Sequence, residues 1–114
     1  MRARVFGRGL MRKRQERAVR ALARKALGRL HRHVKHTELT LKDETPEDPE
    51  NSFTTCTLRL RLREATDVLI LARGPHVGDA LRTAFRRARH ELMRRRRAAA
   101  AARSWHNRPQ PAIG

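Results

Sequence analysis

The chain has 114 residues, enough for one domain with a two-layer core, and 39% of them are hydrophobic. Its 28 Lys and Arg against 11 Asp and Glu give a formal net charge of +17. This surplus predicts a polyanionic partner, with nucleic acid favoured over an anionic membrane surface. The chain has no apolar run near the ~20 residues that span a bilayer and no apolar h-region of a signal peptide. Its single cysteine excludes an internal disulfide framework.

The first predicted elements are a short strand and a long helix. Residues 2–6 alternate weakly, and Gly7-Arg8-Gly9 then predicts a plain turn, since the further residues of a nucleotide-binding loop are missing. Residues 12–33 predict a helix with its basic residues off the apolar stripe. That stripe repeats at intervals of 3 and 1: Val19, Leu22, Ala23, Ala26, Leu27 and Leu30.

Three strands are predicted in the middle of the chain. Residues 37–42 and 53–63 alternate between apolar and polar side chains, and residues 68–73 form a more apolar run that Gly74-Pro75 ends. The connection 43–52 holds five acids, two prolines and no apolar residue, which predicts an exposed, mobile hairpin loop. We expect this acidic loop to repel phosphate and so to orient docking on a nucleic acid.

A second helix is predicted over residues 76–97, again with an apolar stripe: Val77, Ala80, Leu81, Ala84, Phe85, Ala88 and Leu92. Four arginines follow at 94–97, and Arg95 falls back on the stripe, so we expect the helix to have left the core by that point. The domain is predicted to end at residue 97 and a flexible basic, Ala- and Pro-containing tail to fill 98–114.

The order of these elements is β-α-β-β-β-α. Two helices with the same apolar period suit one face of a four-stranded sheet, so the fold class is α+β, a two-layer sandwich. The predicted shared core comprises Leu22, Leu27, Leu30, Leu81, Phe85 and Leu92 with Leu39, Leu41, Leu58 and Leu60.

No catalytic or metal-binding arrangement stands out, so we expect no enzyme activity, no cofactor, no metal and no small-molecule substrate. Cys56 lies in a strand-like alternation and is predicted to be a buried structural thiol. His31, His33 and His36 cluster at a helix end without the thiolates or carboxylates that usually complete a metal site. Trp105 suits stacking on a base, but a tail tryptophan is more often incidental or a partner contact.

Several stretches resemble the ribosome hibernation-promoting factors, also called sigma-54 modulation proteins or ribosome-associated inhibitors. They are VFGR (5–8), ALARKALGRLHRH (21–33), the acidic insert, CTLRLRL (56–62) and VLILARGPHVGDALRTAFRRARHEL (68–92). Together they cover residues 2–97 in the family's element order. The chain ends without the second, dimer-forming domain of the long members, so it resembles a short form and is expected to be monomeric when free.

The resemblance implies a cytoplasmic protein that binds the small ribosomal subunit in the mRNA and tRNA cleft and silences translation during stasis. A second hibernation factor is left open as a further partner, and no membrane partner is expected. The rRNA-binding role carries over, by residue type and position, to basic residues of both helices: Arg17, Arg20, Arg24, Lys25, Arg82, Arg86, Arg89 and Arg94.

Two alternatives stand beside this interpretation. Arginine enrichment of the first helix and the tail, compared with the family, leaves room for looser RNA selectivity. A general RNA- or DNA-binding module is the other possibility, because the α-β-β-β-α part resembles a double-stranded-RNA-binding domain. That family opens its last helix with lysines, however, whereas here the opening is HVGDALR, with Asp79 in place of cations.

A mitochondrial presequence is disfavoured because the basic segment 1–36 lacks serine.

Overall fold

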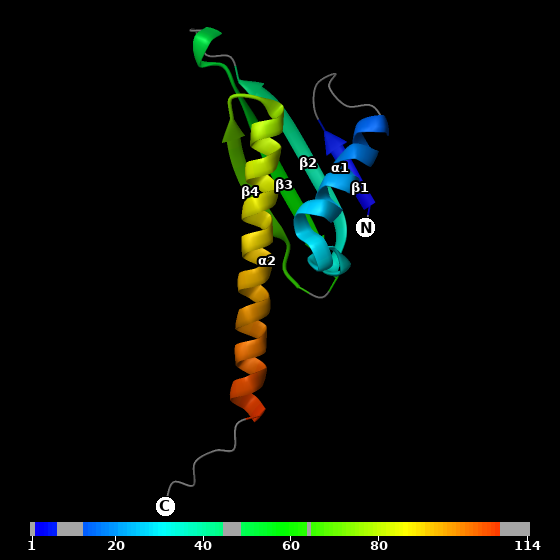
Figure 1. Cartoon of the computed structure of the whole chain (residues 1–114), viewed down its shortest axis with the longest axis vertical. Helices are drawn as coiled ribbons and strands as arrows, with labels where there is room; N and C mark the ends of the chain where they lie inside the picture. The colour runs from blue at the N-terminus through cyan, green and yellow to red at the C-terminus, as the bar shows by residue number, and fades with distance from the viewer. Residues whose placement is uncertain (1, 7–12, 45–48, 64, 108–114) are drawn as a thin grey trace, which may run out of the picture.

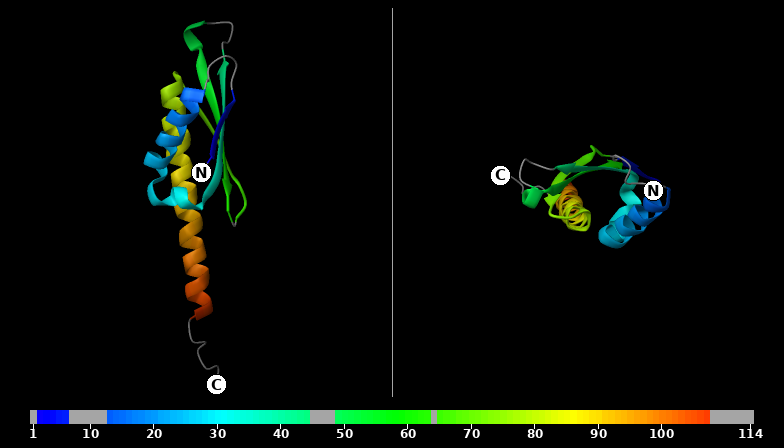
Figure 2. Two further views of the ribbon diagram at one scale, coloured as in Figure 1. Left: turned by 90° about the vertical axis from the view of Figure 1, so that its right-hand side faces the viewer. Right: turned by 90° about the horizontal axis from the view of Figure 1, so that it is seen from above.

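The computed structural model describes residues 2–6, 13–44, 49–63 and 65–107. They form a four-stranded sheet with two helices on one of its faces, as Figures 1 and 2 show. The predicted α+β sandwich is therefore confirmed. The elements in chain order are β1 (Arg2–Phe6), α1 (Lys13–Leu27), the short 3-10 helix η1 (Gly28–His33), β2 (Val34–Glu44), η2 (Pro49–Asn51), β3 (Phe53–Leu62), β4 (Val68–Gly74) and α2 (Val77–Asn107).

The strands lie in the order β1-β2-β3-β4. β1 pairs with β2 in parallel because α1 carries the chain back across the sheet between them. The other two pairs are antiparallel and follow from direct connections between neighbouring strands. The sheet is thus mixed, and β1 and β4 are its free edges.

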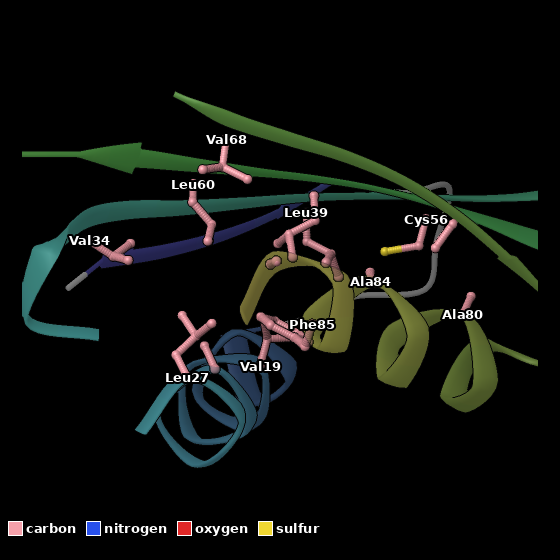
Figure 3. Close-up of a cluster of buried hydrophobic side chains, with 14 of the residues drawn as sticks. Val19, Leu27, Val34, Leu39, Cys56, Leu60, Val68, Ala80, Ala84 and Phe85 are labelled. Atoms are coloured by element: carbon pink, nitrogen blue, oxygen red, sulfur yellow. The ribbon is translucent and has the colours of Figure 1, made fainter. Parts of the chain in front are cut away.

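The core lies between the helices and the sheet, where the apolar stripes meet (Figure 3). Phe85 is the largest fully buried side chain, and it shares the core with Leu27 of α1 and with Leu39, Leu58 and Leu60 of the sheet. Leu41 and Leu92 are also buried, whereas Leu22, Leu30 and Leu81 are half-buried against the cluster. The stripes therefore predicted the core correctly, with three members at its margin.

Both helices end at places that differ from the predicted ones. α1 stops at Leu27 because Gly28 has a φ of 58°, a left-handed conformation that ends an α-helix. The predicted remainder of that helix is η1. The second helix, in contrast, continues to Asn107, ten residues beyond the predicted domain end at 97. Alanine has the highest helix propensity of any residue, so the alanine run 98–102 favours continuation of the helix, and residues 98–107 extend it. Only residues 108–114 of the predicted tail lie outside the described residues.

Leu92 is the last buried residue of α2 as far as Arg103, in agreement with the expectation that the helix has left the core near residue 95, but Arg95 still connects the helix to the sheet. Its guanidinium donates to the carbonyl oxygens of Thr66 and Asp67 in the β3–β4 turn, and it pairs with Glu91 at 3.0 Å. A charged residue on the apolar stripe is therefore a tether to the turn, which fixes the direction of the helix past the end of the sheet.

Close packing of β4 against the start of α2 depends on a glycine. A Cβ at Gly74 would lie 2.6 Å from the backbone nitrogen of Ala80 and 2.8 Å from the Cβ of Asp79. Only glycine permits the chain to turn this tightly from strand to helix. In the part of the chain that the structure describes, no helix combines the length and the apolar character needed to cross a membrane.

Candidate nucleic-acid interface

The eight basic residues predicted to bind rRNA all lie on the two helices and are all exposed. Because both helices cover the same face of the sheet, all eight belong to one layer of the molecule (Figure 2). The structure thus brings the predicted site residues of both helices to a common side. What differs between them is whether each cation already has a partner within the protein.

The basic row on α2 faces toward α1. Arg82, Arg86 and Arg89 follow at intervals of 4 and 3 and so share one side of the helix. The last of them donates from its Nη1 to the carbonyl oxygen of Ala26, 3.3 Å away, near the C-terminus of α1. Arg82 pairs with Asp79 at 2.6 Å. Of this row, only Arg86 has no hydrogen bond or ion pair within the described ranges.

The basic row on α1 lies on the flank that faces away from α2. The buried residues Ala23 and Leu27 are each preceded by a half-buried residue, Leu22 and Ala26, and Ala23 is followed by the exposed Arg24. Residues just before and just after a buried position lie on opposite flanks of a helix. Because Arg89 of α2 donates a hydrogen bond to Ala26, the half-buried flank of α1 faces α2. The basic flank therefore faces away from α2.

The consequence is an arrangement of two rows rather than one patch. Arg17, Arg20 and Arg24 border the outer side of α1, and Arg82, Arg86 and Arg89 border the space between the helices. Lys25, next to the half-buried flank, lies between the two rows. The two rows are therefore separated by the outward side of α1, on which Lys25 is exposed.

Arg94 is the most strongly paired of the predicted residues. Its Nη2 and Nε donate to the two carboxylate oxygens of Glu91 at 2.6 and 3.0 Å. Hydrogen bonds from Arg94 and Arg95 lower the pKa of Glu91 to about 2, and Glu91 in turn raises the pKa of Arg94. The charge of Arg94 is therefore partly compensated inside the protein.

The open face of the sheet carries a second set of exposed residues that the choice of site residues passed over. Arg59 and Arg61 each lie within 4 Å of Asp67, at 3.7 and 3.8 Å, and Arg59 lies 3.9 Å from Glu38. Leu69 and Leu71 of β4 are exposed there. The alternation of β3 already places its arginines outward, which is the sequence signal for this face.

Cys56 and His31 are two further residues that the sequence singled out for their chemistry. Burial of Cys56 raises the pKa of its thiol to about 11, which keeps it protonated and unreactive at neutral pH. Nδ1 of His31 donates to the carbonyl oxygen of Gly28 at 2.6 Å. Three or more His, Cys, Asp or Glu side chains nowhere converge on a metal-binding geometry among the residues that the structure describes.

The comparisons with known proteins gave different results for the sequence and for the fold. The sequence matches no family model and no curated protein. The fold, however, is similar to that of a ribosomal subunit interface protein from Coxiella burnetii, with a TM-score of 0.66 and 7% identity over 84% of this chain and 98% of that one. It is also similar to the N-terminal domain of Protein Y from Thermus thermophilus, with a TM-score of 0.52 and 16% identity over 79% and 92% of the two chains.

Proposed function

We propose that the chain is a ribosome hibernation factor that binds rRNA of the small subunit in the mRNA and tRNA cleft. The observation that carries the proposal is the exposed basic helical layer on a fold shared with a ribosomal subunit interface protein. It acts by occupying a site rather than by catalysis, and as a ribosome-bound factor it works in the cytoplasm.

Charge supplies the binding free energy in this proposal. Each arginine or lysine that contacts a phosphate releases condensed counterions, so affinity depends steeply on salt. The planar guanidinium engages phosphate oxygens through two parallel hydrogen bonds and also stacks on exposed bases, which suits a folded rRNA surface. Arg17, Arg20, Arg24 and Arg86, which lack partners in the described ranges, contribute their full charge, whereas Arg82 and Arg94 share theirs with acids.

The test uses two triple variants that remove equal charge from opposite faces. The helix-face variant carries Arg20→Gln, Arg24→Gln and Arg86→Gln, residues that hold no described contact. The open-face variant carries Arg2→Gln, Arg4→Gln and Arg73→Gln. We expect the helix-face variant alone to stop pelleting with small subunits at moderate salt. Its slope of log affinity against log salt should become shallower by about two to three, at roughly 0.7–0.9 per phosphate contact.

The outcomes separate the proposal from its alternative. Equal losses in the two variants would indicate non-specific attraction by net charge, which is the behaviour of a general nucleic-acid-binding module. Loss only in the open-face variant would place the ribosome contact on the sheet and contradict the proposed helical interface.

A further inference from the structure

A groove lies under the part of α2 that extends past the sheet. Figure 1 shows this helix continuing, in orange and red, well beyond the strands. Between it, η1 and the end of β3 lies a hollow of about 670 Å³. Its lining includes the apolar side chains of Leu30, Leu62, Leu92 and Ala99, and the cations along it are Arg63, Arg95, Arg96 and Arg103.

The groove exists because the side of α2 that faces the core continues past the end of the sheet. Ala99 follows the buried Leu92 by seven residues and therefore lies on the same side of the helix. β3 ends at Leu62, and beyond it no strand of the described chain covers this side of α2. The small alanine side chain leaves the hollow open where a larger residue would fill it.

Two of the lining arginines hold the walls of the groove in place through hydrogen bonds to backbone carbonyl oxygens. Arg95 tethers α2 to the carbonyl oxygens of the β3–β4 turn. The backbone nitrogen of Arg63 donates to the carbonyl oxygen of His33 at 3.0 Å, and its Nε donates to that of Arg32 at 3.2 Å. Arg96 and Arg103, in contrast, have no hydrogen bond or ion pair with any described residue. The hollow is thus preformed, and two of its cations are unengaged.

We propose that this groove holds an unpaired nucleotide of the RNA, with the base against the leucines and the adjoining phosphates on Arg96 and Arg103. Apolar surface and cations side by side match a nucleotide, which has an apolar base face and an anionic backbone. Bases within an RNA duplex are stacked and paired, so only a loop, bulge or single strand can place one here.

Continuity with the basic helical layer favours RNA over an acidic peptide as the occupant. Arg96 also lines a neighbouring hollow of about 370 Å³ between the end of α1 and α2, together with Arg29 and Arg89. Cations thus continue from the α2 row, at Arg89, into the groove, and one strand can follow them. This inference rests on the proposed RNA-binding function and adds the conformation of RNA that the protein selects.

The test fills the groove without changing its charge. Ala99→Leu places a larger side chain in it, and Ala101→Leu makes the same change at an equally exposed position of the same helix that does not line the groove. The probes are a ten-nucleotide oligouridine with one central 2-aminopurine and a ten-base-pair RNA duplex. We expect Ala99→Leu to weaken single-strand binding about fivefold, at the low end of the contribution of one stacked base, and to leave duplex affinity unchanged.

Further readouts make the result decisive. In the parent protein and in Ala101→Leu, the 2-aminopurine fluorescence should change on binding, and Ala99→Leu should abolish that change. Unaltered single-strand affinity and fluorescence in Ala99→Leu would overturn the groove proposal, and small-subunit pelleting would then still stand as the test of function. An acidic amphipathic peptide would be the remaining candidate for the groove in that case. A parent protein that binds neither probe nor small subunits overturns both proposals.

Discussion

The two helices repeat one design, an apolar stripe beside a basic flank, yet their arginines behave differently. On α1, the exposed Arg17, Arg20 and Arg24 make no hydrogen bond or ion pair within the described part of the chain. On α2, most arginines are engaged with carboxylates or with backbone carbonyl oxygens: Arg82, Arg87, Arg89, Arg94 and Arg95. The number of arginines on a helix therefore does not by itself give the charge available to a partner.

Local sequence and position explain this difference. α1 contains a single acid, Glu16, and although it stands four residues before Arg20, the two make no ion pair among the described contacts. In α2, Asp79 and Glu91 do pair with arginines three or four residues further along the helix. α2 also lies beside the edge strand β4 and the end of α1. Arg87 donates to the carbonyl oxygen of Leu71 at 3.0 Å, and Arg89 to that of Ala26. Several arginines of α2 thus make contacts within the domain, whereas Arg17, Arg20 and Arg24 of α1 make none among the described residues.

The largest effect should come from the core that both helices share. Phe85 is 1% exposed, and Phe85→Ala should lower the free energy of unfolding by about 3–5 kcal/mol through lost burial and a residual cavity. Urea denaturation measures this change. Leu71→Ala, at an exposed position, is the control and should change stability little. An unchanged unfolding midpoint for Phe85→Ala would mean that the helices do not pack as described.

A smaller change in stability should distinguish the glycine after the end of α1 from the glycine in the first turn of α2. Gly28 has a φ of 58°, so Gly28→Ala should destabilise the protein by about 1–2 kcal/mol, although a Cβ would meet nothing within 4 Å. Gly78→Ala in the first turn of α2, where the nearest atom is 3.5 Å away, should leave stability unchanged or raise it slightly. Thermal melts of the two variants compare them directly. Equal melting temperatures would contradict the left-handed stop at the end of α1.

Single arginine replacements test the central contrast between free and engaged cations. Arg89→Gln removes a donor to Ala26 and should cost up to about 1 kcal/mol, since the contact is exposed. Arg24→Gln should stay within about 0.5 kcal/mol of the parent protein, because it breaks no described contact. Guanidinium denaturation, with the same dependence of unfolding free energy on denaturant in both variants, measures the difference in stability between them. If Arg24→Gln is the more destabilising, the division of roles between the helices is wrong.

The smallest effect should be a pH dependence that belongs to α2 alone. The folded-state pKa of Glu91 is about 2, below its ordinary value near 4.5, so its contribution to stability is present above pH 4.5 and is lost as pH falls toward 2. Glu91→Gln removes this contribution, and the variant should lose less stability than the parent protein across that window. Thermal melts at pH 5, 4 and 3 provide the comparison. Identical pH profiles would show that the arginine contacts of Glu91 do not affect folding.

Local patterns were sufficient for much of the fold. The alternation around Leu58 and the helical period around Phe85 predicted which side chains are buried, because the hydrophobic effect acts on the period of each element by itself. The strand Arg2–Phe6 was predicted with its observed bounds, and the basic residues of both helices were correctly expected on the side away from the core. Their role in binding RNA stays a prediction.

The tertiary structure decided what depends on partners far away in sequence. Arg95 lies on an apolar stripe, and only the distant β3–β4 turn makes it a tether. Arg89 and Ala26 are 63 residues apart, so no local pattern distinguishes this engaged arginine from the free Arg86. The groove beside Ala99 likewise exists only because a helix of 31 residues outlasts a strand of 10. The sequence by itself determined where charge is concentrated, and the fold determined which of those charges are free, because hydrogen bonds and cavities form between elements that only folding brings together.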